Sequence, residues 1–286
     1  MTIFELMQLI QNRNKALKFF QRLRWKDGLV CSKCGLTALD IEKHSKTKLG
    51  YQKYRCYCSH VFSDTSGTIF HRKRVPPEMW IFALYELSQT KTITSVELGN
   101  KLGIPQKRAW RLLTVLRAHC TVLVEPFYKI MMRGVTEGDE AYFGKGQYNT
   151  EMVQGILQRN KHVLLFPIQD RTEATLKGNI KAHIENYAYI MTDTAAAYGG
   201  LNCMGYTHCT LNHSIEEVSE ANLIHRNTME GYCGNQKKIL YSIHHGVSKK
   251  HLWKYLSEFM LKTNLKQKQF TFSTFLNLFF NPPLTC

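Results

Sequence analysis

Residues 135–144 read VTEGDEAYFG, and we interpret this run as a β-strand that carries Asp139. Three further β-like runs follow it: GILQRN at 155–160, HVLLFPIQD at 162–170 and YAYIMTD at 187–193. An amphipathic stretch, Glu173–Glu185, separates the last two runs, and after Asn227 the pattern is again helical, in two pieces that part near Gly246. Strands that alternate with helices predict an α/β domain over this part of the chain.

The residues before this region predict smaller modules. Apolar residues recur at helical spacing over 2–24, cysteine pairs dominate 29–70, and Pro76-Pro77 opens a further helix of about a dozen residues. The expected parts are an N-terminal helix (1–24), a cysteine-rich module (25–75), a helical region (76–125), the α/β domain (130–265) and a C-terminal tail (266–286). The main boundary is expected near residues 125–133.

The charge is concentrated at the front of the chain. The 286 residues carry a formal net charge of +16. Residues 1–75 hold 15 Lys and Arg against 5 Asp and Glu, a net of +10, whereas residues 131–265 hold 14 against 13, a net of +1. Such a basic front favours a polyanion, most often nucleic acid. The alternative is a solvated basic surface without a partner. A hydrophobic fraction of 44% excludes a disordered or collagen-like chain.

The sequence gives no sign of a membrane partner or of secretion. Its longest strongly apolar run, VLLFPI at 163–168, is far shorter than the roughly eighteen residues that a membrane span needs. The start of the chain carries Glu5 within its apolar stretch and lacks a signal-peptide pattern. We therefore expect a cytoplasmic, DNA-associated protein. Four of the nine cysteines crowd between Cys31 and Cys58, which indicates one metal site plus free thiols.

The crowded cysteines form two close pairs. Cys31-Ser-Lys-Cys34 is followed 22 residues later by Cys56-Tyr-Cys58. Two such pairs can supply four thiolates to one structural Zn²⁺, as in a zinc ribbon. Because the second pair is one residue shorter than the usual C-x-x-C, His60 is an alternative to Cys58 as the fourth ligand. The other interpretation is four buried free cysteines.

The stretch Ser95–Arg117, SVELGNKLGIPQKRAWRLLTVLR, has the helix–Gly–helix spacing of a helix–turn–helix. Its expected core consists of Leu98, Leu102, Ile104, Trp110 and Leu113. Lys107, Arg108 and Arg111 are expected on the exposed face of the second helix, where DNA contacts are made. A plain helical hairpin is the alternative.

Three acids are spaced across the α/β domain. Asp139 and Asp193 belong to strand-like runs and Glu230 to a helical one, with separations of 54 and 37 residues. Such acids can converge to hold two divalent ions, and their hard oxygens favour Mg²⁺ or Mn²⁺ over zinc. Asn227 and Lys237 share one helix face with Glu230, so Lys237 could reach a phosphate. Taken singly, each acid is more often a solvated or capping residue.

Together these motifs resemble the ISXO-like insertion-sequence transposases, the bacterial relatives of eukaryotic Merlin elements. The matching stretches are RWKDGLVCSKCG, YRCYC, FSDTSGTIFHRKRVPPEMWIFALYEL, ELGNKLGIPQKRAWRLL, GDEAYFGKG, TDTAAAY, NTMEGYCGNQKK and HHGVSKKHLWKYLSEF, over roughly residues 20–260. The resemblance implies a ribonuclease-H-like catalytic domain, a mixed sheet flanked by helices, with Asp139 and Asp193 as the first two metal ligands. The third is Glu230 or Asn227, and we favour Glu230.

The resulting expectation is a Mg²⁺-dependent DNA transposase. It would bind terminal inverted repeats through residues 1–122, hydrolyse the element's ends and join the 3′-hydroxyl to target DNA. Its partner would be double-stranded DNA, both transposon ends and target, and we expect a homodimer or a larger assembly on DNA. The alternatives are a sequence-specific DNA-binding protein with an inactive transposase domain, and a structure-selective nuclease that cleaves without joining.

Overall fold

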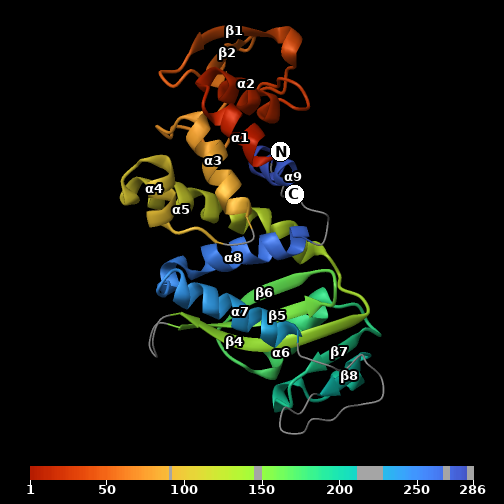
Figure 1. Ribbon diagram of the computed structural model, residues 1–286. Helices are drawn as coiled ribbons and strands as arrows, with labels where there is room; N and C mark the ends of the chain where they lie inside the picture. The colour runs from red at the N-terminus through yellow and green to blue at the C-terminus, as the bar shows by residue number, and fades with distance from the viewer. Residues whose placement is uncertain (90–91, 145–149, 211–227, 267–270, 282–286) are drawn as a thin grey trace. The chain divides into compact units, whose positions relative to one another are not determined.

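The computed structural model describes residues 1–89, 92–144, 150–210, 228–266 and 271–281 (Figure 1). They belong to two compact units, which are described separately. The first unit contains Met1–His119 together with helix α9 (Phe272–Phe280), and the second begins at Cys120. The division lies a few residues before the boundary expected near 125–133, within helix α5 (Gln106–Leu123).

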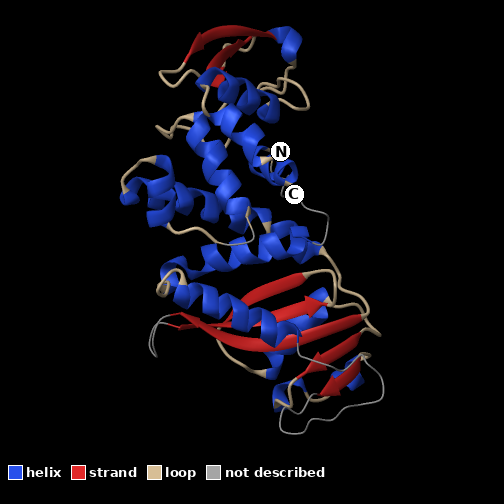
Figure 2. Cartoon of the chain, in the orientation of Figure 1, coloured by secondary structure: helices blue, strands red, loops and turns tan. Residues whose placement is uncertain are grey.

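The second unit is built on a mixed five-stranded sheet (Figure 2). Its strands are β4 (Val135–Gly144), β5 (Thr150–Gln158), β6 (Val163–Ile168), β7 (Tyr189–Thr192) and β8 (Thr207–Thr210). Their spatial order is β6-β5-β4-β7-β8. The first three in this order pair antiparallel, whereas β7 runs parallel to β4 and β8 runs parallel to β7. The long strand β4 is therefore central.

Helices flank this sheet on both faces. They are α6 (Glu173–His183), α7 (Thr228–Ser242) and α8 (Lys249–Lys266), with short 3₁₀ turns η2 (Glu125–Lys129), η3 (Ala196–Tyr198) and η4 (Leu201–Met204). Adjacent residues of β5 point to opposite faces. The Gln154 side chain donates to the Leu176 carbonyl of α6 at 3.1 Å, whereas Gly155 faces Met229 of α7. This arrangement is consistent with the expected ribonuclease-H-like domain.

The first unit packs helices around an aromatic core. Phe20 lies at its centre, with ring centroids 4.4–5.1 Å from those of Tyr51, Phe70 and Phe280. The helices are α1 (Ile3–Ile10), α2 (Arg13–Arg24), α3 (Pro77–Ser88), α4 (Ser95–Leu102), α5 and α9, with a short turn η1 (Ala38–Asp40). A three-stranded antiparallel sheet contains β1 (Ile41–Lys46), β2 (Gln52–Cys56) and β3 (Val61–Ser63). No described helix has the length and apolarity needed to cross a membrane.

Several elements differ from those expected. The single helix over 2–24 is two helices, because the Asn12 side chain accepts from the backbone N–H groups of Asn14 and Lys15 and so begins α2 anew. Phe4, one of the apolar residues at helical spacing over 2–24, is 78% exposed on α1. The C-terminal stretch expected as a tail contains α9, whose Phe side chains are buried in the first unit. Strand β8 was not expected, since THCT lacks an apolar alternation.

Gly155 gives a direct test of the contact between the sheet and α7. A Cβ atom at this position would overlap the Met229 side chain. We therefore expect Gly155→Ala to lower the free energy of unfolding by about 1–3 kcal/mol, measured by urea denaturation. Gly178 in α6 is the matched control, because an added Cβ meets no atom within 4 Å there. Gly178→Ala should leave stability unchanged or raise it. Equal stability of the two variants would contradict the packing of Met229 against β5.

Candidate functional site

The four paired cysteines meet in the first unit. Their sulfur atoms all lie within 4.8 Å of one another, with Cys34 Sγ 3.5 Å from Cys56 Sγ and Cys31 Sγ 3.8 Å from Cys58 Sγ. Zn–S bonds of about 2.3 Å in a tetrahedron separate the sulfurs by about 3.8 Å, so the cluster fits one zinc ion. His60 is engaged elsewhere: its Nε2 lies 3.3 Å from the Ser32 hydroxyl, and its ring stacks on Phe62. The geometry favours Cys58 over His60 as the fourth ligand.

The backbone and core around the cysteines suit this arrangement. Gly35 adopts φ +77°, the left-handed conformation that the turn after the first pair requires. Cys31 and Cys56 are buried together with Tyr54 and Phe62. The apolar core of this module is small, and two of the four cysteines are part of it.

The helix–turn–helix candidate also appears as two helices. Thr94 caps α4, and Gly103, at φ +63°, ends it before α5 begins at Gln106. Lys107, Arg108 and Arg111 are all exposed on the first turns of α5, as predicted.

One core residue of this unit was predicted wrongly. Trp110 is 43% exposed, because the helix turns Ala109, Leu112 and Leu113 inward instead. The inward residues are spaced three and four apart, as an amphipathic helix requires. The large apolar ring of Trp110 therefore lies on the surface, beside the exposed cations.

The parallel pairing of β4 with β7 brings two of the predicted acids together. Val135 pairs with Tyr189 and Glu137 with Met191, a constant offset of 54 residues. Extending this register by two residues places Asp193 beside Asp139. The Asp193 carboxylate is held there by the Ala195 backbone N–H, which donates to Oδ1 at 3.0 Å.

The third acid arrives from α7. Asp139, Asp193 and Glu230 line one cavity of about 300 Å³ in the second unit. Lys237, two turns beyond Glu230 on the same helix face, also lines it, and its Nζ lies 5.7 Å from the centroid of the Phe143 ring. Asn227, the alternative third ligand, lies outside the described residues.

The carboxylates share a cavity without forming a tight cluster. In the described part of the chain, the four cysteines are the one group of three or more potential ligands whose atoms lie within 4.8 Å of one another. The three acids are therefore spread wider than the ligand set of a single small ion. Carboxylate oxygens on the wall of one cavity are the ligand type that hard divalent cations take.

Comparison with known proteins supports one family. The profile of the ISXO2-like transposase domain matches residues 131–264, a range that contains all three acids. Over this range the chain is similar to the ISXO2-like transposases. A protein of Halobacterium salinarum, described as an uncharacterized protein in transposable element ISH50, is 24% identical over 280 residues, which cover 90% of this chain and 92% of that protein. The resemblance to ISXO-like transposases that the motifs indicated is confirmed.

One solved structure is also similar, though weakly. It is a simian T-cell lymphotropic virus intasome in complex with PP2A regulatory subunit B56 gamma, with a TM-score of 0.31 and 14% identity. The match covers 46% of this chain and 49% of that chain. A similarity at this level carries no argument about fold or function.

The acids of the second unit act on one another electrostatically. The pKa of Asp139 is raised from 3.8 to about 6. Burial is the main cause; the Glu140 N–H that donates to Oδ1 at 2.8 Å acts in the opposite direction. The negative charges of Glu140, Asp193 and Glu230 raise the pKa further. The cavity therefore disfavours a charged Asp139 unless a cation offsets the carboxylates.

One acidic residue that lines the cavity of the second unit was not predicted. Glu140 follows Asp139 directly and lines the same cavity, and Arg171 lies 2.7 Å from its Oε2. The Tyr198 hydroxyl donates to the other oxygen of Glu140. Arg171 also lies 4.0 Å from Asp193 Oδ2. The adjacent acids in GDEAYFG were the available signal for Glu140, but nothing in the sequence indicated its partners.

The start of α7 is tied to β4 through a buried carboxylate. Glu137 is 1% exposed, and its Oε2 accepts from the Met229 backbone N–H at 2.9 Å. Its Oε1 accepts from Arg159 Nε at 2.6 Å. A carboxylate at a helix N-terminus satisfies an N–H group that has no partner within the helix and interacts favourably with the helix dipole. Because Met229 directly precedes Glu230, this contact sets where Glu230 enters the cavity.

The raised pKa of Asp139 predicts a stability effect with a definite sign. When the pKa of a carboxyl is higher in the folded protein than in the unfolded chain, the folded protein becomes less stable as the pH rises. For Asp139 this occurs between about pH 3.8 and about pH 6. Asp139→Asn removes this cost while keeping an oxygen that accepts from Glu140. We expect the midpoint of thermal unfolding at pH 8, without added divalent cations, to rise by about 2–4 °C. The difference should vanish near pH 4.

The matched control is Glu185→Gln, which removes a half-buried carboxylate of the same unit that lies outside the cavity and pairs with the exposed Arg133. Its midpoint should change little. Added Mg²⁺ should raise the midpoint of the wild type and not that of Asp139→Asn. An Asp139→Asn midpoint below that of the wild type at pH 8 would contradict the electrostatic account.

Proposed function

We propose that this protein is a DNA transposase of an insertion sequence, which cleaves the element's ends and joins the freed 3′-hydroxyl to target DNA. The observation that carries the proposal is the cavity lined by Asp139, Asp193 and Glu230. The three acids come from β4, from the turn after β7 and from α7, and they lie within an ISXO2-like transposase domain. Convergence of carboxylates from separate elements is what divalent-metal phosphoryl transfer requires.

The residues of the cavity take distinct roles in the proposal. Asp139, Asp193 and Glu230 would hold Mg²⁺ or Mn²⁺, since carboxylate oxygens suit hard cations. The bound ions would neutralise charge on the phosphodiester and activate the attacking hydroxyl. Lys237 lines the cavity from the same face of α7 and would bind a phosphate oxygen of the DNA strand. Glu137 would act as a positioning residue, because it fixes the first turn of α7.

The first unit would supply DNA binding. In the proposal, the four cysteines hold one structural Zn²⁺ and form a zinc ribbon, and α4 with α5 forms a helix–turn–helix. Residues 1–122 would bind the terminal inverted repeats, and Lys107, Arg108 and Arg111 would contact the DNA. The protein would act on double-stranded DNA in the cytoplasm as a homodimer or larger assembly.

The catalytic proposal is tested with the element's own ends. Purified protein is incubated with a labelled duplex of the terminal repeat, a target plasmid and Mg²⁺, and cleavage and joining are followed on gels. Asp139→Asn and Asp193→Asn should each lower both steps by at least about 10³-fold, while end binding in a mobility-shift assay stays intact. Lys237→Ala should reduce both steps less. Glu185→Gln is the matched control and should keep wild-type activity.

The third ligand is decided in the same assay. Glu230→Gln should abolish cleavage, whereas Asn227→Ala should only reduce it. The reverse result would move the third ligand to Asn227. A wild-type protein that binds the ends but leaves them uncut with both Mg²⁺ and Mn²⁺ would overturn the proposal and favour the DNA-binding protein with an inactive domain. Cleavage without any joining would instead favour the nuclease.

The zinc proposal predicts one zinc ion per chain by elemental analysis of the purified protein. Cys34→Ser and Cys58→Ser should lower this content to near zero and destabilise the first unit, because a small module depends on its metal for folding. Cys203→Ser changes an exposed cysteine of the second unit and should leave the content at one. His60→Ala should also retain zinc. A wild-type protein without zinc, or zinc loss in His60→Ala alone, would contradict the ligand assignment.

A further inference from the structure

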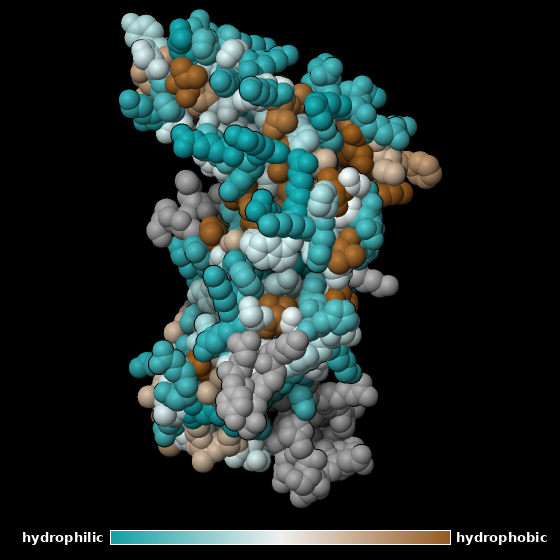
Figure 3. All heavy atoms as spheres, turned by 90° about the vertical axis from the view of Figure 1, so that its left-hand side faces the viewer, coloured by the Kyte–Doolittle hydropathy of each residue, from teal (hydrophilic) through white to brown (hydrophobic). Residues whose placement is uncertain are grey.

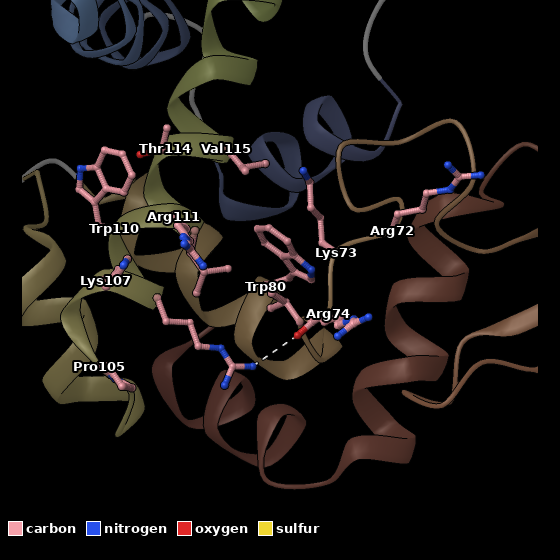
Figure 4. A pocket seen from close by; sticks show the side chains of 13 residues that line it. Arg72, Lys73, Arg74, Trp80, Pro105, Lys107, Trp110, Arg111, Thr114 and Val115 are labelled. Atoms are coloured by element: carbon pink, nitrogen blue, oxygen red, sulfur yellow. Dashed lines mark hydrogen bonds between the residues drawn. The ribbon is translucent and has the colours of Figure 1, made fainter.

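The first unit contains a basic groove of about 790 Å³ that the helix–turn–helix pattern did not predict. One wall is a face of α5, and the other is the segment between β3 and α3 (Figure 4). Six cationic side chains line it: Arg72, Lys73, Arg74, Lys107, Arg108 and Arg111. All six are exposed, and no Asp or Glu is found among the described residues of the lining.

The two walls are connected directly. Arg108 Nη2 donates to the backbone carbonyl of Arg74 at 3.4 Å, the dashed line in Figure 4. The side chain of Arg74 is not used in this contact and remains available to a ligand. Figure 4 shows Lys73 and Arg111 on opposite sides of Trp80. Cations thus face the same space from two elements more than thirty residues apart in the sequence.

The backbone of the 72–74 segment is held in an uncommon conformation. Arg72 has φ +54°, in the left-handed region that residues other than glycine rarely adopt. Such backbone conformations cost free energy and cluster at ligand-binding sites. Arg72 itself extends away from α5 in Figure 4, so its conformation serves to place the following Lys73 and Arg74 at the groove.

Trp80 lies beneath the groove with an unused hydrogen-bond donor. Its side chain is 1% exposed and lines the groove, and its Nε1 has no hydrogen-bond partner. A buried N–H without an acceptor costs free energy that a ligand oxygen would recover. Side chains at the groove surface must shift to admit that oxygen, and the long flexible chain of Lys73 lies next to the ring.

We propose that this groove binds the phosphodiester backbone of duplex DNA, with Lys73 and Arg74 holding one strand against α5 and the Trp80 N–H donating to a phosphate oxygen. The proposal rests on the proposed function and deepens it. It adds a second DNA-binding element, the 72–74 segment, to the helix–turn–helix.

The size and surroundings of the groove favour a polyanion. Six cations around about 790 Å³ exceed what a single inorganic phosphate would neutralise. The exposed ring of Trp110 adds an apolar surface at the same groove, which suits the deoxyribose of a nucleic-acid strand. Figure 3 views the molecule from the side on which α4 and α5 lie in Figure 1, and hydrophilic residues cover most of this face.

The proposal is tested by fluorescence anisotropy with a labelled generic duplex of about 30 base pairs, at several KCl concentrations. Removing two phosphate contacts lowers the slope of log K against log salt by roughly 1.8. Lys73→Ala/Arg74→Ala should show this change and bind about tenfold more weakly near 100 mM salt. The control, Lys161→Ala/Lys181→Ala, removes the same charge from exposed positions of the second unit, outside the groove. Its slope should match that of the wild type.

The outcomes separate this inference from the proposed function. A wild-type protein that binds the duplex, with equal slopes for the groove and control variants, overturns the groove and leaves the catalytic proposal standing. A wild-type protein that shows the expected slope difference but does not cleave the element's ends overturns the catalytic proposal and leaves the groove standing. Trp80→Phe keeps the aromatic packing but removes the donor, and it should weaken binding about tenfold, whereas Trp253→Phe in the second unit should not. Unchanged affinity of Trp80→Phe would overturn the role of the indole.

Discussion

The buried carboxylate of Glu137 is the interaction on which the proposed site depends. Alone on β4 it would be a costly buried charge. Its two oxygens instead take hydrogen bonds from Arg159 and from the first turn of α7. A pair this deep is weak evidence for stability, since desolvation offsets much of its attraction. What it provides is position: the helix that carries Glu230 and Lys237 begins at a fixed point on the central strand. The Met229 side chain, seated over Gly155, fixes the same helix turn by shape.

The remaining order of the site comes from strand register. The spacing of 54 residues between Asp139 and Asp193 is also the offset of the β4–β7 pairing, so Asp193, directly after β7, reaches the same level of the sheet as Asp139 on β4. This register exists because β4 and β7 are parallel neighbours in one sheet. Burial raises the pKa of Asp139, and the negative charges of Glu140, Asp193 and Glu230 raise it further. A site that disfavours the ionised form of Asp139 gains from binding a divalent cation.

Much of this organisation could be predicted from the sequence where local pattern and tertiary packing agree. Strand β4 spans the residues expected for it, and the helix after Pro76 buries Trp80 and Leu84 as its spacing required. Prediction failed where a partner distant in the sequence decides the outcome. Trp110 looked like a core residue by type, but helix phase exposes it. Glu137 resembled any strand acid, since its partners lie 22 and 92 residues away. The basic groove likewise depends on a fold that brings 72–74 to α5, which no periodicity reveals.

The central claim is that Asp139, Asp193 and Glu230 together bind divalent metal. Its most direct measurement is the anomalous scattering of Mn²⁺ in crystals of the wild-type protein soaked with MnCl₂. The account predicts density in the cavity between the three carboxylates, with oxygen atoms of at least two of them roughly 2.2 Å from an ion. Mn²⁺ bound elsewhere on the protein while this cavity holds none would contradict it.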